Sequence, residues 1–390
     1  MSQAASLDPA AATQAALTAL ARGEAGQARD LLERVIEAGQ ADAPVWLALA
    51  QARGRLGDEA GKGAALDQAL ALEPNDLRVL LAKGDHLSGS GNPRGASAFY
   101  AAALQYLPRY KSLPAHLQEG LRRAQGANQQ LARDLENHVR ANLEQSGAGG
   151  AAAPQRFKNA VDILFGKKRA YVQEPRYLYY PELPQVQFYE RGDFPWLDAV
   201  EAATPSIREE LHGVIGGDFK PYVAQAKDRP LNAQAGLAGN PAWSAYFLHK
   251  DGAPQEGAAR CRRTLAALGE APLTSIPARA PSVLFSKLAG GAHIPPHTGM
   301  LNTRLICHLP LIVPGSCEFR VGNDVRTWVE GKAWAFDDTI EHEAWNRSAT
   351  DRYILIFDIW RPELSEEERL CVASLCQAID AYRGAVPWDA

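Results

Sequence analysis

The sequence predicts a multidomain α + β protein in which a helical repeat domain precedes a domain built from short antiparallel strands. Three observations carry this prediction. One pattern recurs after 34 residues between residues 43 and 110, the composition loses all periodicity at 146–155, and from residue 281 short β-branched and aromatic runs alternate with turn residues. We therefore expect a helical domain over 10–145, a linker over 146–155, and a β domain with flanking helices over 156–390.

The helical part is expected to consist of paired helices that repeat. Residues 43–76 align with 77–110 without a gap, and large, small and proline positions coincide in the pairs Trp46 with Leu80, Ala50 with Gly84, Leu66 with Tyr100, and Pro74 with Pro108. Small residues let two helices approach closely, and a proline ends the second helix. The pattern resembles the tetratricopeptide repeat, whose members bind peptides or protein partners; a weaker copy covers 9–42. An ordinary alanine-rich bundle is the alternative.

The charge and composition exclude several functional classes. The 390 residues carry a formal net charge of −4, whereas binders of nucleic acids or anionic membranes show a basic excess. No apolar run reaches the roughly 18 residues of a membrane span, and the N-terminus lacks the basic and apolar regions of a signal peptide. The five cysteines form no CxxC pair, which argues against a zinc cluster and suits a reducing compartment. We expect a cytoplasmic protein that binds neither nucleic acid nor membrane.

The part of the chain after the linker is expected to begin with helices at 156–168 and 196–216 and to continue as a sheet. Seven strands are predicted, at 282–289, 304–313, 317–321, 325–331, 333–338, 343–348 and 353–360. Their number and spacing favour an antiparallel sandwich or jelly roll, whose mouth can hold a metal and a small ligand.

Two of these strands place charged residues on an inward face. Side chains alternate along a strand, so Arg304, Ile306 and His308 share one face of their strand. By the same rule, the last strand has Arg352, Ile354, Ile356 and Asp358 on one face. A buried arginine or histidine is costly without an anionic partner, which indicates a bound carboxylate.

Three segments in order carry a family resemblance: "PHTG" (296–299), "EGKAWAFDDTIEHEAWN" (330–346) and "DIWRPEL" (358–364). They are similar to the aspartyl/asparaginyl β-hydroxylase family, and the likeness extends over about 177–375. Members of that family are Fe(II)- and 2-oxoglutarate-dependent oxygenases built on a double-stranded β-helix, a jelly-roll or cupin-like fold. The resemblance implies this fold and this chemistry here.

The resemblance also implies a metal centre. His297 of "PHTG" and His342 of "IEHEAW" match the family's iron ligands. Most related oxygenases add a carboxylate two residues after the first histidine. Gly299 occupies that slot, as in the family, which dispenses with the acid. No catalytic residue is implied beyond the metal centre. His293 lies outside the motif and is expected to be structural, and Asp337 and Asp338 are expected to form a turn.

Four further residues match positions that the family uses for the cosubstrate. Arg352, ten residues after His342, matches the arginine that pairs with the distal carboxylate of 2-oxoglutarate. Ser286 and His308 match residues that help to hold the carboxylates, and Arg304 matches an arginine of the same strand. Ile306 is a departure, because the family often has a second arginine there. Two alternatives follow: the cosubstrate or substrate is anchored more weakly at this position, or Arg304 takes over the role.

The resemblance implies a dioxygenase that consumes O2 and 2-oxoglutarate and hydroxylates an Asp or Asn side chain of a peptide or protein, or a small amino-acid-like substrate. The repeats would recruit or position a partner. Two alternatives stay open: a non-catalytic adaptor whose β domain has lost its chemistry, and a hydroxylase of a lipid acyl chain. A basic residue of the segment 217–280, such as Lys250 or Arg263, is a candidate contact to substrate.

Overall fold

The computed structural model describes residues 8–109, 112–217, 219–223 and 238–384. The chain divides into two units, Met1–Val161 and Asp162–Ala390. The segment 146–155, for which a linker was expected, lies within the first unit.

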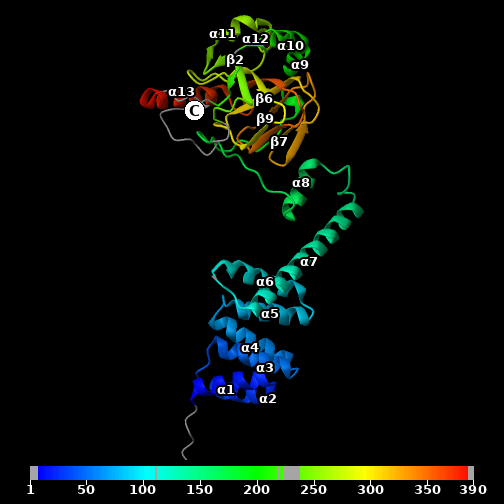
Figure 1. Cartoon of the computed structure of the whole chain (residues 1–390), viewed down its shortest axis with the longest axis vertical. Coiled ribbons are helices and arrows are strands. Elements are labelled where there is room, and N and C mark those ends of the chain that lie inside the picture. The colour runs from blue at the N-terminus through cyan, green and yellow to red at the C-terminus, as the bar shows by residue number, and fades with distance from the viewer. Residues whose placement is uncertain (1–7, 110–111, 218, 224–237, 385–390) are drawn as a thin grey trace, which may run out of the picture. The chain divides into compact units, whose positions relative to one another are not determined.

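The first unit consists of helical hairpins with a fixed repeat length (Figure 1). The helices are α1 (Pro9–Arg22), α2 (Ala25–Glu37), α3 (Ala43–Arg55), α4 (Glu59–Leu72), α5 (Leu77–Gly89) and α6 (Pro93–Tyr106). Each of α3 to α6 begins 34 residues after the helix two places before it. The predicted tetratricopeptide-like repeat is therefore confirmed, and the weak first copy forms a complete hairpin. A short turn, η1 (Leu107–Arg109), and the long helix α7 (Ala115–Gln145) follow.

The repeat spacing has a local cause in capping and packing. Asp8, Asp42 and Asp76 accept backbone N–H groups at the starts of α1, α3 and α5. Gly84 packs under the ring of Tyr100, and a Cβ at that glycine would lie 2.4 Å from a ring carbon. The small and large positions of the sequence pattern are therefore where two helices of one hairpin touch.

The second unit is built around two antiparallel sheets. The larger sheet has the order β1-β2-β4-β11-β6-β9 with β3 paired to β2, and the smaller has the order β5-β10-β7-β8. The strands of the larger sheet are β1 (Lys220–Pro221), β2 (Trp243–Lys250), β3 (Ala253–Pro254), β4 (Val283–Leu288), β6 (Arg304–Ile312), β9 (Trp334–Phe336) and β11 (Arg352–Trp360). Those of the smaller are β5 (His293–His297), β7 (Cys317–Val321), β8 (Asp324–Thr327) and β10 (His342–Asn346).

The two sheets face each other across one apolar layer, and helices cover the other face of the larger sheet. Trp243, Leu284 and Ile354 of the larger sheet share a core with Phe319 and Ala344 of the smaller one. The opposite face of β6 and β11 packs against α9 (Leu197–Ala202), α10 (Thr204–His212) and α12 (Arg262–Ala267). The remaining helices are α8 (Gln155–Leu164), η2 (Arg191–Asp193), α11 (Glu256–Arg260) and α13 (Glu366–Arg383).

The structure differs from the predicted elements of the second unit in several places. The helix expected over 196–216 is divided into α9 and α10, with Pro205 in the first turn of the second helix. β1, β2, β3 and β5 were not predicted as strands, and α11, α12 and α13 were not predicted as helices. The predicted strand 325–331 ends at Thr327, where the chain turns to bury Trp328. Within the described part of the chain, every helix is too short or too polar to cross a bilayer.

Candidate active site

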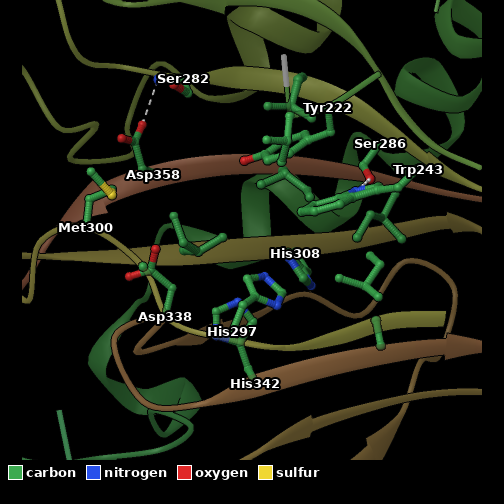
Figure 2. Close-up of a pocket in the computed structure, with 18 of the residues that line it drawn as sticks. Tyr222, Trp243, Ser282, Ser286, His297, Met300, His308, Asp338, His342 and Asp358 are labelled. Atoms are coloured by element: carbon green, nitrogen blue, oxygen red, sulfur yellow. Dashed lines mark hydrogen bonds between the residues drawn. The ribbon is translucent and has the colours of Figure 1, made fainter. Parts of the chain in front are cut away.

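A cavity of about 140 Å³ lies between the two sheets (Figure 2). All six residues singled out in the sequence line it: Ser286, His297, Arg304, His308, His342 and Arg352. The remaining residues of the two predicted inward faces, Ile306 of β6 and Ile354, Ile356 and Asp358 of β11, line the cavity as well. The predicted alternation of side chains along these two strands is therefore confirmed. The cavity thus joins residues from both sheets and from segments more than 60 positions apart.

Two imidazoles form the centre of the cavity. His297 on β5 and His342 on β10 are directly paired in the antiparallel register, and their ring centroids are 4.1 Å apart. The Nδ1 of His297 lies 2.8 Å from the carbonyl oxygen of Pro295, and the Nδ1 of His342 lies 3.1 Å from that of Ile340. Because a carbonyl only accepts, Nδ1 carries the hydrogen in both rings and Nε2 keeps its lone pair.

The protonation state of these imidazoles suits a metal. Burial lowers the pKa of His297 to about 4 and holds the pKa of His342 well below its usual value. Both rings are therefore neutral at neutral pH, and neutral imidazole is the form that binds Fe(II) and similar divalent ions. A ring fixed by a hydrogen bond from its other nitrogen to a backbone carbonyl is also the usual arrangement around a metal. The two rings therefore fit a divalent metal ion.

Gly299 faces a carboxylate rather than empty space. Its N–H donates to the carbonyl of Asp338 at 2.6 Å, and a Cβ built on it would lie 2.1 Å from Oδ2 of Asp338. No side chain fits at this position unless Asp338 moves. Over the described ranges, no group of three or more His, Cys, Asp or Glu is placed to hold a metal. A bound ion would have two protein ligands here.

Asp338 is the site residue that the sequence analysis missed. Asp337 does form the expected turn, since its Oδ1 accepts from the N–H and hydroxyl of Thr339, and it pairs with Arg361 at 3.0 Å. Asp338 instead lines the cavity, and burial raises its pKa to about 6. The sequence did contain a signal for Asp338. Side chains alternate along an extended chain, and Asp338 lies two residues after Phe336 of β9, so both side chains are directed to the same face and line the cavity.

One end of the cavity holds a buried cation. Arg352 is 1% exposed, its guanidinium stacks on Trp328 at 4.6 Å, and its Nη2 lies 3.5 Å from the hydroxyl of Ser286. It forms no ion pair with any carboxylate that the structure describes, and burial lowers its pKa to about 10. Nδ1 of His308 is buried beside it without a hydrogen-bond partner among the described residues. A buried guanidinium without an anionic partner lowers the stability of the fold, so an anionic ligand would bind favourably at this end of the cavity.

Arg304 has a different environment. Its Nη1 lies 2.9 Å from Oδ2 of Asp358, and its Nη2 lies 3.5 Å from Oδ2 of Asp338. It is therefore engaged by carboxylates of the protein, away from the Arg352 end. Ile306 lies between Arg304 and His308 on the same face of β6.

Three other predicted residues lie in distinct places. His293 is outside the cavity, pairs with Glu343 at 2.9 Å and stacks on Trp345. Lys250 lines the cavity. Arg263 does not, because it is exposed and bound by two glutamates of α10.

Comparison with known proteins identifies the second unit. A family profile described as aspartyl/asparaginyl beta-hydroxylase matches residues 201–362. The aspartyl/asparaginyl beta-hydroxylase of Mus musculus is 38% identical over 128 residues, which are 33% of this chain and 17% of that protein. The ornithine lipid ester-linked acyl 2-hydroxylase of Rhizobium tropici is 32% identical over 224 residues, 56% of this chain and 76% of that protein.

The first unit is similar to a solved repeat structure. The first TPR domain of the human RPAP3 protein is 17% identical, and the match covers 30% of this chain and 91% of that chain with a TM-score of 0.27. This chain spans 17% of the length of the mouse and human β-hydroxylases that it matches. The profile match and the coverage of the Rhizobium hydroxylase show that the chain belongs to the aspartyl/asparaginyl β-hydroxylase family.

Proposed function

We propose that the chain is an Fe(II)- and 2-oxoglutarate-dependent hydroxylase whose second unit is a double-stranded β-helix. The observation that carries the proposal is Arg352, a buried guanidinium without an acidic partner among the described residues, in the same cavity as two neutral imidazoles. A small diacid that also binds a metal satisfies both features at once. A non-catalytic adaptor would gain nothing from a buried, uncompensated charge.

The residues divide the work between metal and cosubstrate. Nε2 of His297 and Nε2 of His342 would hold the iron. Ser286 and His308 would join Arg352 on the distal carboxylate of 2-oxoglutarate. When bound, the iron supplies the oxidation in which substrate C–H, O2 and 2-oxoglutarate become substrate C–OH, succinate and CO2.

The side chains around His342 exclude water from this chemistry. The rings of Phe319 and Phe336 lie with centroids 5.9 Å and 5.4 Å from that of His342, and both are buried. A dry, apolar wall strengthens the electrostatic contacts to the cosubstrate and limits side reactions.

The substrate proposed first is an Asp or Asn side chain of a peptide or protein, or a small amino-acid-like molecule, in the cytoplasm. The helical repeat would then bind the polypeptide that carries it. A second candidate is a lipid acyl chain, because the Rhizobium acyl 2-hydroxylase is matched over 76% of its length.

The test is succinate release from 2-oxoglutarate by purified protein with Fe(II), ascorbate and O2. Wild type should release succinate, and His342→Ala should release none. The matched control is His293→Ala, which removes a nearby imidazole that lies outside the cavity and should keep the wild-type rate. Equal inactivity of the wild type and His342→Ala would instead favour the adaptor.

A further inference from the structure

One buried ion pair beside the cavity has no part in the proposed chemistry. Arg361, from the segment "DIWRPEL", and Asp337, from "FDDT", are both fully buried, and Nη1 of Arg361 lies 3.0 Å from Oδ2 of Asp337. Neither residue lines the cavity. Apolar side chains in place of a buried ion pair often leave the stability of a protein unchanged or raise it. Stability alone therefore does not explain this pair.

Asp337 fixes the turn that orients His342. Its Oδ1 accepts from the N–H and the hydroxyl of Thr339 at 3.0 and 2.6 Å, and its carbonyl accepts from the N–H of Ile340 at 3.3 Å. The carbonyl of Ile340 is the acceptor for Nδ1 of His342, at 3.1 Å. The orientation of this imidazole therefore depends on a turn that the carboxylate of Asp337 holds.

Arg361 also holds the loop that follows His297. Its Nη1 donates to the carbonyl oxygen of Asn302 at 3.0 Å, five residues after that histidine. Gln173 joins the same two points, because its Nε2 donates to Oδ2 of Asp337 at 2.7 Å and its Oε1 accepts from Nδ2 of Asn302 at 2.9 Å. The network therefore connects the chain after one imidazole with the chain before the other.

We propose that Arg361 and Asp337 are positioning residues of the metal site, which keep the two imidazoles in the relative orientation that a shared metal ion requires. They act through His297 and His342 rather than on the ion. This inference rests on the proposed function, because it assumes that the two histidines hold a metal. Replacement of a residue that orients a metal ligand typically weakens metal binding about 10- to 100-fold.

The first experiment compares two buried threonines with the same surroundings. The hydroxyl of Thr339 donates to Asp337 at 2.6 Å, and its N–H reaches the same carboxylate. The hydroxyl of Thr264 on α12 donates to Glu210 of α10, also at 2.6 Å, and its N–H again reaches the same carboxylate. Thr264 lies outside the cavity.

The Kd for Mn(II), titrated by electron paramagnetic resonance, should separate the two variants. Thr339→Val should raise this Kd about threefold or more, because one hydrogen bond that holds the turn is lost. Thr264→Val should keep the wild-type Kd, although urea denaturation should show a similar loss of stability in both variants. Equal Kd values in the two variants would overturn the inference.

The second experiment separates positioning from stability. Asp337→Leu leaves Arg361 buried without its carboxylate, so it should unfold at a lower urea concentration than wild type. Asp337→Leu/Arg361→Met removes both charges and should regain part of that loss, yet its Kd for Mn(II) should stay about tenfold or more above wild type. The control Arg279→Met/Asp380→Leu removes a largely buried ion pair outside the cavity and should keep the wild-type Kd.

The binding of Mn(II) to wild type tests the proposed metal site by itself. If wild type binds no Mn(II), that site is wrong. If wild type binds Mn(II) and the Kd of Asp337→Leu/Arg361→Met recovers together with its stability, the pair only supports the fold, and the present inference alone is wrong. If this double variant does not fold, the comparison of Thr339→Val with Thr264→Val decides.

Discussion

His297 and His342 face each other on two neighbouring antiparallel strands, with ring centroids 4.1 Å apart and each Nδ1 directed at a carbonyl of its own strand or the turn before it. The pairing is set by the backbone register, so the two Nε2 atoms are held by the sheet rather than by a loop. Such a site is organised before any ion arrives.

Loss of one imidazole should strongly weaken metal binding. His342→Ala removes one of two protein ligands, and we expect the Kd for Mn(II), used in place of Fe(II), to rise about 100-fold or more. Titration followed by electron paramagnetic resonance measures this directly. His293→Ala should bind as wild type does. Unchanged affinity in His342→Ala would show that the ion binds elsewhere.

Replacement of Arg352 should make the protein more stable and unable to bind its cosubstrate. Arg352→Met removes a buried charge that no described carboxylate neutralises, so without ligand the free energy of unfolding should rise by about 1–4 kcal/mol. Urea denaturation measures that free energy, and calorimetry with Mn(II) and 2-oxoglutarate measures binding. The control is Arg347→Met, at an exposed arginine that is paired with Glu318. It should neither raise the free energy of unfolding nor weaken the binding of 2-oxoglutarate. A destabilised Arg352→Met would mean that the guanidinium supports the fold.

A methyl group at Gly299 should be disruptive. In Gly299→Ala the new Cβ would overlap the carboxylate of Asp338, and we expect the free energy of unfolding to fall by about 1–3 kcal/mol. The double variant Gly299→Ala/Asp338→Ala removes the clash and should recover most of this loss. Gly315→Ala, where a Cβ meets nothing within 4 Å, is the control. If denaturation gives the same stability for Gly299→Ala as for wild type, Asp338 moves freely.

The stability of Asp338→Asn should depend on pH in a defined direction. Burial raises the pKa of Asp338 from 3.8 to about 6, so the folded protein binds this proton more tightly than the unfolded chain. The ionised carboxylate therefore lowers the free energy of unfolding above pH 6, and the cost disappears as the pH falls toward 4. Asp338→Asn has no carboxylate to ionise and therefore keeps the free energy of unfolding that the wild type loses above pH 6. A pKa raised by roughly two units corresponds to a loss of at most about 3 kcal/mol.

Urea denaturation at several pH values tests this. The difference between Asp338→Asn and wild type should be largest above pH 7 and should vanish near pH 4. A difference that grows toward acid would mean that the folded state lowers the pKa of Asp338.

The sequence predicted the parts of the site that follow from local periodicity. Alternation along β6 and β11 placed Arg304, His308 and Arg352 on inward faces, and the structure confirms that all three line the cavity. The 34-residue period predicted the helices of all three hairpins, because each hairpin repeats the same contacts between residues that are close in the sequence.

The parts that were missed depend on distant contacts. β5 contains Pro295 and Pro296, which argue against a strand in isolation, yet it is an edge strand with β10 as its single named neighbour, where missing N–H groups cost little. The partners of Arg304 are 34 and 54 residues away in the chain, and no local pattern indicates them. The sequence alone therefore could not indicate Asp338 and Asp358 as the contacts of Arg304.

The metal and cosubstrate sites are tested most directly by a crystal structure of the protein grown without oxygen, with Mn(II) and an unreactive analogue of 2-oxoglutarate. We expect the ion to bind Nε2 of His297 and Nε2 of His342. We also expect the distal carboxylate of the analogue to contact the guanidinium of Arg352 and the hydroxyl of Ser286. An ion bound away from these two rings, or an analogue whose carboxylate avoids Arg352, would contradict the proposed sites.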